Sequence, residues 1–268
     1  MKTDPSLAID IAQIIRAKRK DGKAPKLLVA ILKKLTHVDQ INEYLVKGYE
    51  GVDFCVGAME TLDVTLDVEG MENLVDGQRY TFVSNHPLGG IDGVALGVVF
   101  GRRFDGHVRY LVNDILMFLK GLAPICVPIN IIGGQSRDLP RLIDEAFASD
   151  EHMIVFPAGK CSRKIDGRIQ DRAWGKAFVA KSVQTGRQVV PVHFCAENSK
   201  AFYRWDRFFQ LLRIKANLTM LFLPDEMFKA RHSTFRIRIG KPIPPETFDR
   251  SRSTYEWAQW VREEVYKL

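Results

Sequence analysis

The sequence predicts an α/β fold with a mostly parallel central sheet flanked by helices and with an N-terminal helical extension. From residue 62 onward, short β-prone runs alternate with helical stretches, which is the order of strand–helix–strand units in a parallel sheet. The first 50 residues contain helical patterns only. The 268 residues, 46% hydrophobic and 26% charged, suit one large globular domain with an extension. We therefore expect a helical cap over residues 1–50 and an α/β domain over residues 51–268.

Three helices are predicted for the N-terminal cap, over residues 6–20, 26–35 and 38–47. Apolar side chains recur in them at helical spacing, as Leu7 and Ile11 do in the first helix. Lysines and arginines accumulate in the first two helices. Basic amphipathic helices cover a core with a solvated outer face, or they lie on an anionic membrane. Both interpretations stay open from these helices alone.

The elements predicted for the α/β domain alternate along the chain. Residues 62–68 alternate apolar and polar side chains, as a half-exposed strand does, whereas residues 80–83 and 152–156 have the continuous apolar composition of buried strands. Further strands are predicted at residues 107–112, 125–131, 188–194 and 234–239, and helices at residues 94–100, 115–119, 138–149, 172–185 and 253–267. The sequence contains no internal repeat and no long linker.

Residues with catalytic chemistry follow the strand at residues 80–83. His86 comes directly after it, Gly89 and Gly90 form a turn, and Asp92 stands just beyond. The ends of sheet strands are where α/β proteins place their sites. A neutral imidazole accepts a proton from a hydroxyl near pH 7, and a carboxylate on its other nitrogen fixes the tautomer. Free amides of the glycine turn would stabilise a developing oxyanion.

The same stretch also fits a structural role. Asp92 is well placed to cap the next helix, and His86 would then be a residue of a surface loop. A histidine with an aspartate nearby arises readily by chance, so this stretch alone leaves both interpretations open.

A second loop, residues 156–164, repeats the arrangement of strand, proline–glycine turn and polar or basic residues. Lys160 supplies a compact positive charge and Arg163 a forked one, and both suit a phosphate or carboxylate. Lys164 and Arg168 add to the local positive field. The alternative is a solvated basic loop without a ligand.

The order of four sequence blocks resembles that of the glycerolipid acyltransferase superfamily, which includes glycerol-3-phosphate and lysophosphatidate acyltransferases. That family carries Asn-His, four residues and Asp; then a turn near Pro-Val or Ile-Asp-Arg; then Phe-Pro-Glu-Gly-Thr-Arg-Ser; then a strand with Val-Pro-Val. The matching segments here are Asn85-His86 with Asp92, Val127-Pro128-Ile129-Asn130, Phe156-Pro157-Ala158-Gly159-Lys160-Cys161-Ser162-Arg163 and Val190-Pro191-Val192. The resemblance spans residues 80–195.

The sequence departs from the family pattern at two places. Five residues rather than four separate His86 from Asp92, and the glycine pair would have to absorb the extra one as a bulged turn. Ala158 stands where the family has a Glu, whose implied role is to hold a glycerol-type acceptor. The segments HPLGGIDG and FPAGKCSR are closer to a bacterial branch that is labelled as hemolysins and linked to O-acylation of lyso-aminolipids, such as lyso-ornithine or lyso-glycine lipids.

The resemblance implies an O-acyltransferase that moves a fatty acyl group from acyl carrier protein or coenzyme A to the hydroxyl of a lysolipid. A lyso-aminolipid is the expected acceptor, and no cofactor is implied beyond the acyl thioester co-substrate. The alternatives are a lysophosphatidate acyltransferase and a membrane-associated lipid-binding protein on the same scaffold. A hydrolase is disfavoured because the sequence has no G-x-S-x-G motif.

The implied roles fall on residues of the two loops. His86 is the expected general base, Asp92 orients it, and the amides of Gly89 and Gly90 are the expected oxyanion donors. The residues implied to bind substrate are Asn85, Lys160, Ser162, Arg163 and Arg168, and the residues of the motif expected to be structural are Phe156, Pro157, Gly159 and Pro191.

The net charge of +7 favours anionic partners. A membrane surface fits the aromatic and basic stretch at residues 201–228, although such stretches are also found in cores. No nucleic-acid-binding signature is present. The four cysteines are scattered singly, which predicts reduced thiols and no metal site. Without a clean apolar run of about 20 residues, we expect a cytoplasmic protein, peripheral on the inner face of the membrane, with no transmembrane helix.

Overall fold

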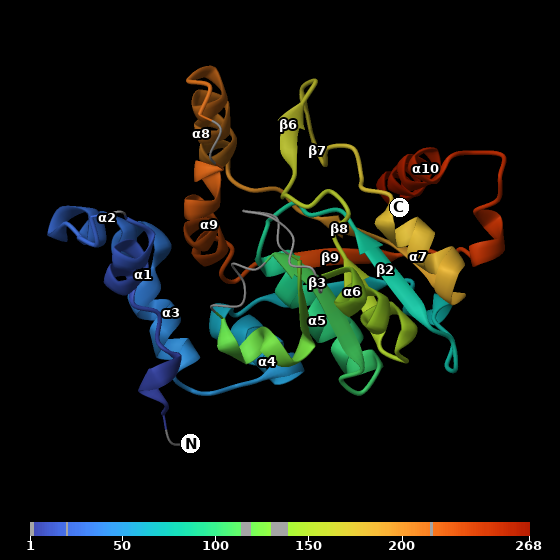
Figure 1. Ribbon diagram of the computed structural model, residues 1–268, viewed down its shortest axis with the longest axis horizontal. Coiled ribbons are helices and arrows are strands. Elements are labelled where there is room, and N and C mark those ends of the chain that lie inside the picture. The colour runs from blue at the N-terminus through green and yellow to red at the C-terminus, as the bar shows by residue number, and fades with distance from the viewer. Residues whose placement is uncertain (1–2, 20, 114–118, 130–138, 215–216) are drawn as a thin grey trace.

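The centre of the molecule is a seven-stranded sheet in the order β1-β9-β8-β2-β5-β3-β4 (Figure 1). The computed structural model describes residues 3–19, 21–113, 119–129, 139–214 and 217–268. The strands are β1 (Thr65–Glu69), β2 (Tyr80–Ser84), β3 (Val108–Asn113), β4 (Cys126–Ile129), β5 (His152–Val155), β8 (Gln188–Cys195) and β9 (Thr234–Ile239). β8 and β9 pair antiparallel, and the other neighbours pair parallel. The predicted mostly parallel sheet is therefore confirmed.

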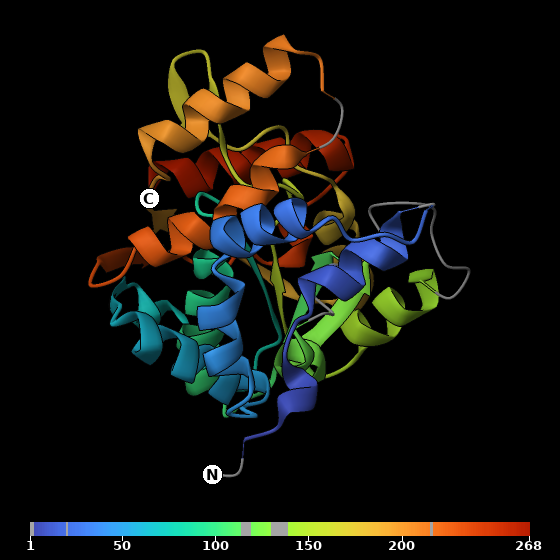
Figure 2. The same cartoon turned by 90° about the vertical axis from the view of Figure 1, so that its left-hand side faces the viewer.

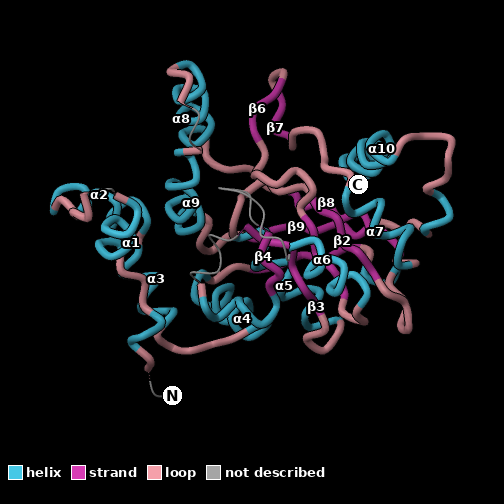
Figure 3. The backbone as a smooth tube through the Cα atoms, viewed as in Figure 1, coloured by secondary structure: helices cyan, strands magenta, loops and turns pink. Residues whose placement is uncertain are grey.

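Helices cover both faces of this sheet (Figure 3). They are α4 (Gly51–Leu62), α5 (Ile91–Arg103), α6 (Leu139–Ala148), α7 (Ala177–Thr185) and α10 (Thr254–Lys267). α4 and α5 pack together in one apolar core, and α6, α7 and α10 contribute to a second core. α10 begins with a capping box, in which the Ser253 hydroxyl accepts the Glu256 backbone N–H and the Glu256 carboxylate accepts the Ser253 N–H.

The two cores explain why β2 is apolar at consecutive positions. Tyr80 and Phe82 belong to the core beneath α4 and α5, whereas Val83 belongs to the core beneath α7 and α10. Successive side chains of a strand point to opposite faces, so a strand covered on both sides can bury apolar residues at consecutive positions. Phe82 is fully buried and stacks on Phe100 of α5, with 3.6 Å between ring centroids. This packing fixes the strand from which the first loop leaves.

The N-terminal residues form η1 (Pro5–Leu7), α1 (Ile11–Lys18), α2 (Lys26–Thr36) and α3 (Val38–Leu45). These short helices agree with the predicted ones. Tyr44 and Leu45 belong to the same core as β2, and His37 hydrogen-bonds Asp225 of α9 (Leu223–Lys229). Figure 2 shows α1, α2, α8 and α9 on the same side of the molecule. The division into a cap and one α/β domain stays a prediction.

Several elements differ from the sequence prediction. α4 was not predicted, because two glycines and a continuous apolar composition hide its helical period. The predicted helix at residues 172–185 starts only at Ala177, since Trp174 is drawn into the second core and its backbone N–H donates to Gln259. The basic loop continues into a hairpin of β6 (Arg163–Ile165) and β7 (Arg168–Gln170). The predicted helix at 115–119 lies, except for Leu119, outside the described residues.

The C-terminal half carries α8 (Lys200–Leu211), η5 (Leu218–Phe222) and α9 between β8 and β9. The Ser199 hydroxyl caps α8 by accepting the Phe202 backbone N–H. A 3-10 segment, η4 (Lys120–Ile125), precedes β4, and two further 3-10 turns are η2 (Met71–Asn73) and η6 (Pro245–Thr247). Among the helices that the structure describes, none has the length and apolar character needed to cross a bilayer.

Candidate active site

The two loops singled out in the sequence meet at the carboxyl ends of three neighbouring parallel strands. His86 follows β2, Phe156 follows β5, and the end of β8 lies on the other side of β2. The backbone N–H of Ser162 donates to the carbonyl of His86 at 2.7 Å, which joins the loops directly. A parallel sheet brings the carboxyl ends of its strands to one edge, so residues 70 positions apart become neighbours there.

His86 and Asp92 form a hydrogen-bonded pair, with 3.0 Å between the imidazole Nδ1 and the carboxylate Oδ2. Asp92 is completely buried, and its carboxylate also accepts the backbone N–H groups of Leu88, Gly89 and Gly93 at 2.9–3.2 Å. Four donors therefore satisfy the carboxylate. With Nδ1–H donated to Asp92, the other ring nitrogen, Nε2, keeps its lone pair to accept a proton.

The environment sets the charge of this pair. Burial alone would raise the pKa of Asp92, but His86 and the amides of Leu88 and Gly89 outweigh it and hold the pKa below its ordinary value. Burial alone would lower the pKa of His86, but Asp92 and then Asp171 raise it above 6.5. His86 therefore loses its proton, and becomes a proton acceptor, at a higher pH than it would without these carboxylates.

The glycine turn accommodates the extra residue between His86 and Asp92. Gly89 has φ of +76°, which favours glycine, and a Cβ there would lie 2.9 Å from the Cβ of Cys161. The turn thus folds back against the second loop and still delivers Asp92 to the ring. The amide of Gly89 is committed to Asp92, whereas that of Gly90 has no acceptor among the described residues. Of the two amides expected to donate to an oxyanion, only that of Gly90 is therefore available among the described residues.

The second loop begins with a tight turn beneath the imidazole. Phe156 stacks on the His86 ring, with 4.2 Å between centroids, and its carbonyl accepts the backbone N–H of Gly159, which has φ of +65°. The carbonyl of Pro157 accepts the N–H of Gly175. These contacts hold the turn against the His86 ring, and the structural roles expected of Phe156, Pro157 and Gly159 stay a prediction. Lys160 follows the turn and is exposed.

Three residues expected to bind substrate instead hold the site together, because their side chains are buried and paired with protein groups. The Asn85 amide donates to the carbonyl of Phe194 and accepts its backbone N–H, which ties β2 to β8. The Ser162 hydroxyl donates to Asp171 at 2.6 Å. Arg163 forms an ion pair with Asp206 of α8 and donates to Thr219 of η5. Because these side chains are buried and hydrogen-bonded within the protein, they do not face a ligand, and positioning roles replace these expectations.

The positive charge that faces solvent near the loops comes from other residues. Lys160, Lys164, Arg168 and Arg172 are all exposed, and none of them makes an ion pair within the described part of the chain. Lys160 and Lys164 belong to the second loop, Arg168 to the β6–β7 hairpin, which contacts α8, and Arg172 to the segment between β7 and α7. Lys160 and Arg168 are thus the sequence-predicted ligands that remain available to an anion.

Comparison with known proteins shows the family of this chain. A family model described as Acyltransferase matches residues 15–268. This chain belongs to the acyltransferase family. Two curated relatives named lyso-glycine lipid O-acyltransferase are similar along the entire chain: that of Bacteroides thetaiotaomicron is 52% identical over 271 residues, covering 99% of this chain and 100% of its own. That of Phocaeicola vulgatus is 50% identical, covering 100% and 98%. The predicted superfamily and its aminolipid branch are confirmed.

A solved structure of a 1-acyl-sn-glycerophosphate acyltransferase from Thermotoga maritima aligns with 96% of this acyltransferase and 86% of its own chain. The TM-score is 0.48 and the sequence identity is 15%.

Some residues of the acyltransferase site carried no signal in the sequence. Asp171 lies between the loops, where it accepts the backbone N–H of His86 at 3.3 Å. The Asn198 side chain donates to the carbonyl of Pro87 at 3.0 Å and so holds the first loop from the far side. Neither residue belongs to a spaced motif, and only the packing of β7 and β8 brings them to His86.

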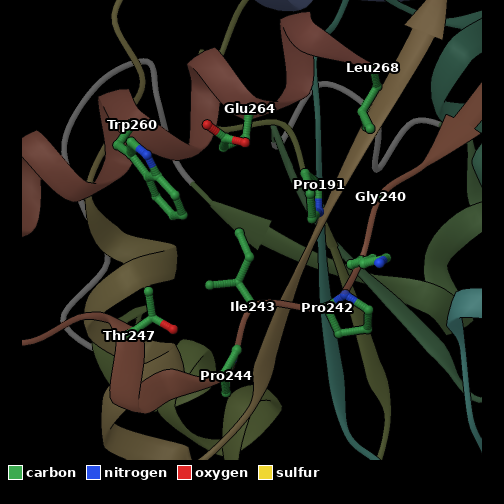
Figure 4. Close-up of a pocket in the computed structure, with 10 residues that line it drawn as sticks. Pro191, Gly240, Pro242, Ile243, Pro244, Thr247, Trp260, Glu264 and Leu268 are labelled. Atoms are coloured by element: carbon green, nitrogen blue, oxygen red, sulfur yellow. The ribbon is translucent and has the colours of Figure 1, made fainter.

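A hollow of about 320 Å³ in the acyltransferase lies away from this pair (Figure 4). It is lined by residues of β8, of the β9–α10 connection and of α10, including Lys241, Ile243 and Trp260, and it contains none of the loop residues. Pro191 faces this hollow, where a Cβ on Gly240 would approach it to 2.8 Å. Its expected role as a structural residue of the motif is therefore in strand packing. Among the described residues, no group of three His, Cys, Asp or Glu side chains could hold a metal ion.

Proposed function

We propose that this acyltransferase transfers a fatty acyl group from an acyl thioester to the hydroxyl of a lyso-glycine lipid. The observation that carries the proposal is the His86–Asp92 pair, whose Nδ1 is committed to a buried carboxylate while Nε2 can accept a proton. The names and the high identity of the two full-length relatives support the acceptor class. Ala158, at the position where glycerol-type enzymes have Glu, supports it as well.

In the proposed reaction, Nε2 of His86 takes the proton of the acceptor hydroxyl as its oxygen attacks the thioester carbonyl. Asp92 stabilises the imidazolium that forms, and the Gly90 amide is the proposed donor to the tetrahedral oxyanion. Collapse of this intermediate breaks the C–S bond and completes the new C–O ester bond. The imidazolium returns its proton to the leaving thiolate, and His86 is ready for another cycle.

An acceptor assay tests this function. With purified protein and an acyl-carrier-protein or coenzyme A thioester, free thiol should appear only when lyso-glycine lipid is added, and mass spectrometry should find the diacylated product. Equal or faster turnover with 1-acyl-glycerol-3-phosphate would favour the lysophosphatidate alternative. Lipid binding without thiol release from either donor would favour a non-catalytic binding protein.

We further propose that Lys160 and Arg168 bind the carboxylate headgroup of the acceptor. Replacing both with glutamine should raise the KM for lyso-glycine lipid about ten-fold, with a smaller effect on kcat, because a charge-assisted contact present in both ground and transition states is lost. Steady-state kinetics measure this effect. A methyl ester of the acceptor lacks the anion and should be used equally well by variant and wild type.

A matched control is Lys241→Gln, which removes an exposed positive charge beside the hollow of Figure 4 and should leave KM unchanged. If the double variant kept the wild-type KM for the free carboxylate, the headgroup assignment would be wrong.

An anionic membrane is the proposed docking partner, and the surface of α8 is the proposed contact. Exposed apolar side chains there are Trp205, Phe208, Leu211, Leu212, Ile214 and, from η5, Leu221. Arg204, Arg207 and Arg213 are exposed among them. Such a mixture of apolar side chains and arginine suits the boundary between headgroups and acyl chains. α2 contacts η5 and adds exposed Leu27 and Ile31 on the same side (Figure 2).

A triple variant in which Phe208, Leu211 and Leu212 are each changed to serine should bind phosphatidylglycerol-containing vesicles at least ten-fold more weakly. The reason is that three apolar side chains that would be buried in the membrane are lost. Vesicle flotation at low and high salt measures this. Val183→Ser, which changes an exposed apolar residue of α7, is the control and should bind normally. Absence of wild-type binding at both salt concentrations would refute the membrane contact.

A further inference from the structure

A second buried carboxylate lies beside the His86 loop. Asp171, between β7 and α7, is 1% exposed. Its Oδ1 accepts the Ser162 hydroxyl at 2.6 Å and the His86 backbone N–H at 3.3 Å, and its Oδ2 accepts the Trp174 indole N–H at 2.9 Å. Its backbone N–H donates to the hydroxyl of Tyr266 in α10. One carboxylate thus joins both motif loops to the second core.

We propose that Asp171 is a positioning residue that supplies His86 with a second negative charge for the proton transfer. The proposal rests on the proposed function, in which His86 becomes positively charged as the acceptor hydroxyl loses its proton. The hydrogen bond of Asp171 to His86 is with the backbone N–H, whereas the ring nitrogen Nδ1 is bonded to Asp92. It acts by fixing the backbone of His86 and by favouring the imidazolium electrostatically.

The surroundings of Asp171 indicate that its charge, and not only its hydrogen bonds, matters. Among the described residues, no lysine or arginine forms an ion pair with it, although three donors reach its oxygens. A buried carboxylate without a cation is costly, and burial raises the pKa of Asp171 despite those donors. An imidazolium at His86 is the cation that would compensate it. The stabilisation therefore grows as the proton moves to His86, so it is stronger in the transition state than in the ground state and accelerates the reaction.

Other charged and titratable groups also face this region, and they do not replace Asp171. Asp92 reaches the ring from α5, and Arg163 of β6 opposes the imidazolium with its own positive charge. Cys161 lies against Gly89 in the second loop, and Arg262 of α10 donates to the backbone carbonyl of Asp171 rather than to its carboxylate. Asp92 and Asp171 are thus the negative groups that favour a protonated His86.

The test compares Asp171→Asn with Trp174→Phe. Asparagine keeps an oxygen for Ser162 and His86 but loses the charge and the bond to Trp174. Phenylalanine at 174 loses that same bond while the charge remains. NMR titration of the His86 ring should show a lower pKa in D171N and an unchanged one in W174F. The acid limb of kcat should shift to lower pH only in D171N, and its kcat at the optimum should fall about ten-fold with little change in KM.

Two results would overturn the proposal: a D171N protein whose His86 titrates as in the wild type, or an equal shift in W174F. A second measurement uses the wild-type protein, in which the Asp171 carboxyl carbon should respond to the titration of His86. A carboxyl signal insensitive to His86 would overturn it too. Because these titrations need no turnover, they stay informative if the acyl-transfer assay itself fails.

Discussion

Replacing His86 with alanine is expected to lower acyl transfer by about a thousand-fold while the protein stays folded. The variant removes the nitrogen that accepts the hydroxyl proton, and no other described side chain is paired with Asp92 in its place. Alanine also leaves Asp92 buried with its three amide donors only. His86→Asn restores a donor towards Asp92 without a titratable nitrogen, so it should regain stability and not activity. Thiol release and thermal unfolding, measured side by side, check both parts.

His107→Ala serves as the control for this experiment. His107 hydrogen-bonds Glu151, but its side chain is 69% exposed at the start of β3, and its loss should change neither turnover nor folding. Near-normal acyl transfer by H86A would show that a different group takes the proton.

Replacing Arg187 with methionine is expected to lower the free energy of unfolding by roughly 3 to 5 kcal/mol. Arg187 is fully buried between α7 and β8, and its guanidinium donates to backbone carbonyls of Phe147, Ser149, Glu151 and, at 3.4 Å, Tyr80. Burial lowers its pKa to about 10, so the arginine still carries its charge at neutral pH. Methionine would fill much of the volume but leave these carbonyls without a donor. Urea unfolding at neutral pH measures the loss.

The matched control is Arg141→Met on the exposed face of α6. Arg141 pairs with Glu145 one turn away, and such an exposed pair contributes only about 0.5 kcal/mol or less. Equal stability losses for the two arginines would refute the stabilising role of the hydrogen bonds from Arg187 to these carbonyls. R187M should affect activity only through the fraction of unfolded protein.

The comparison of sequence and structure is most informative at the charged residues. Lys160 and Arg163 are equally basic in the sequence, yet Lys160 is exposed after its turn and Arg163 is buried against Asp206 and Thr219. The local sequence does not encode this difference, because Asp206 and Thr219 are contributed by α8 and η5, about 40 to 55 residues further along the chain. The burial of Arg187 was not predicted for the same reason, because its acceptor carbonyls belong to segments distant in the sequence.

The sequence by itself predicted the seven strands of the central sheet and most of the helices, and its family resemblance implied the pairing of His86 with Asp92. These are local properties: apolar periodicity, turn residues, and a spacing short enough for one glycine turn to bring Nδ1 and a carboxylate together. Only the tertiary structure shows that Asp171 accepts the backbone N–H of His86 and that the amide of Gly89 donates to Asp92. It also decided that Asn85, Ser162 and Arg163 position the loops instead of facing a substrate. The burial and the hydrogen-bond partners of these residues depend on segments that are distant in the sequence. Those segments come together only at the carboxyl ends of the parallel strands, so the spacing of residues along the chain does not predict them.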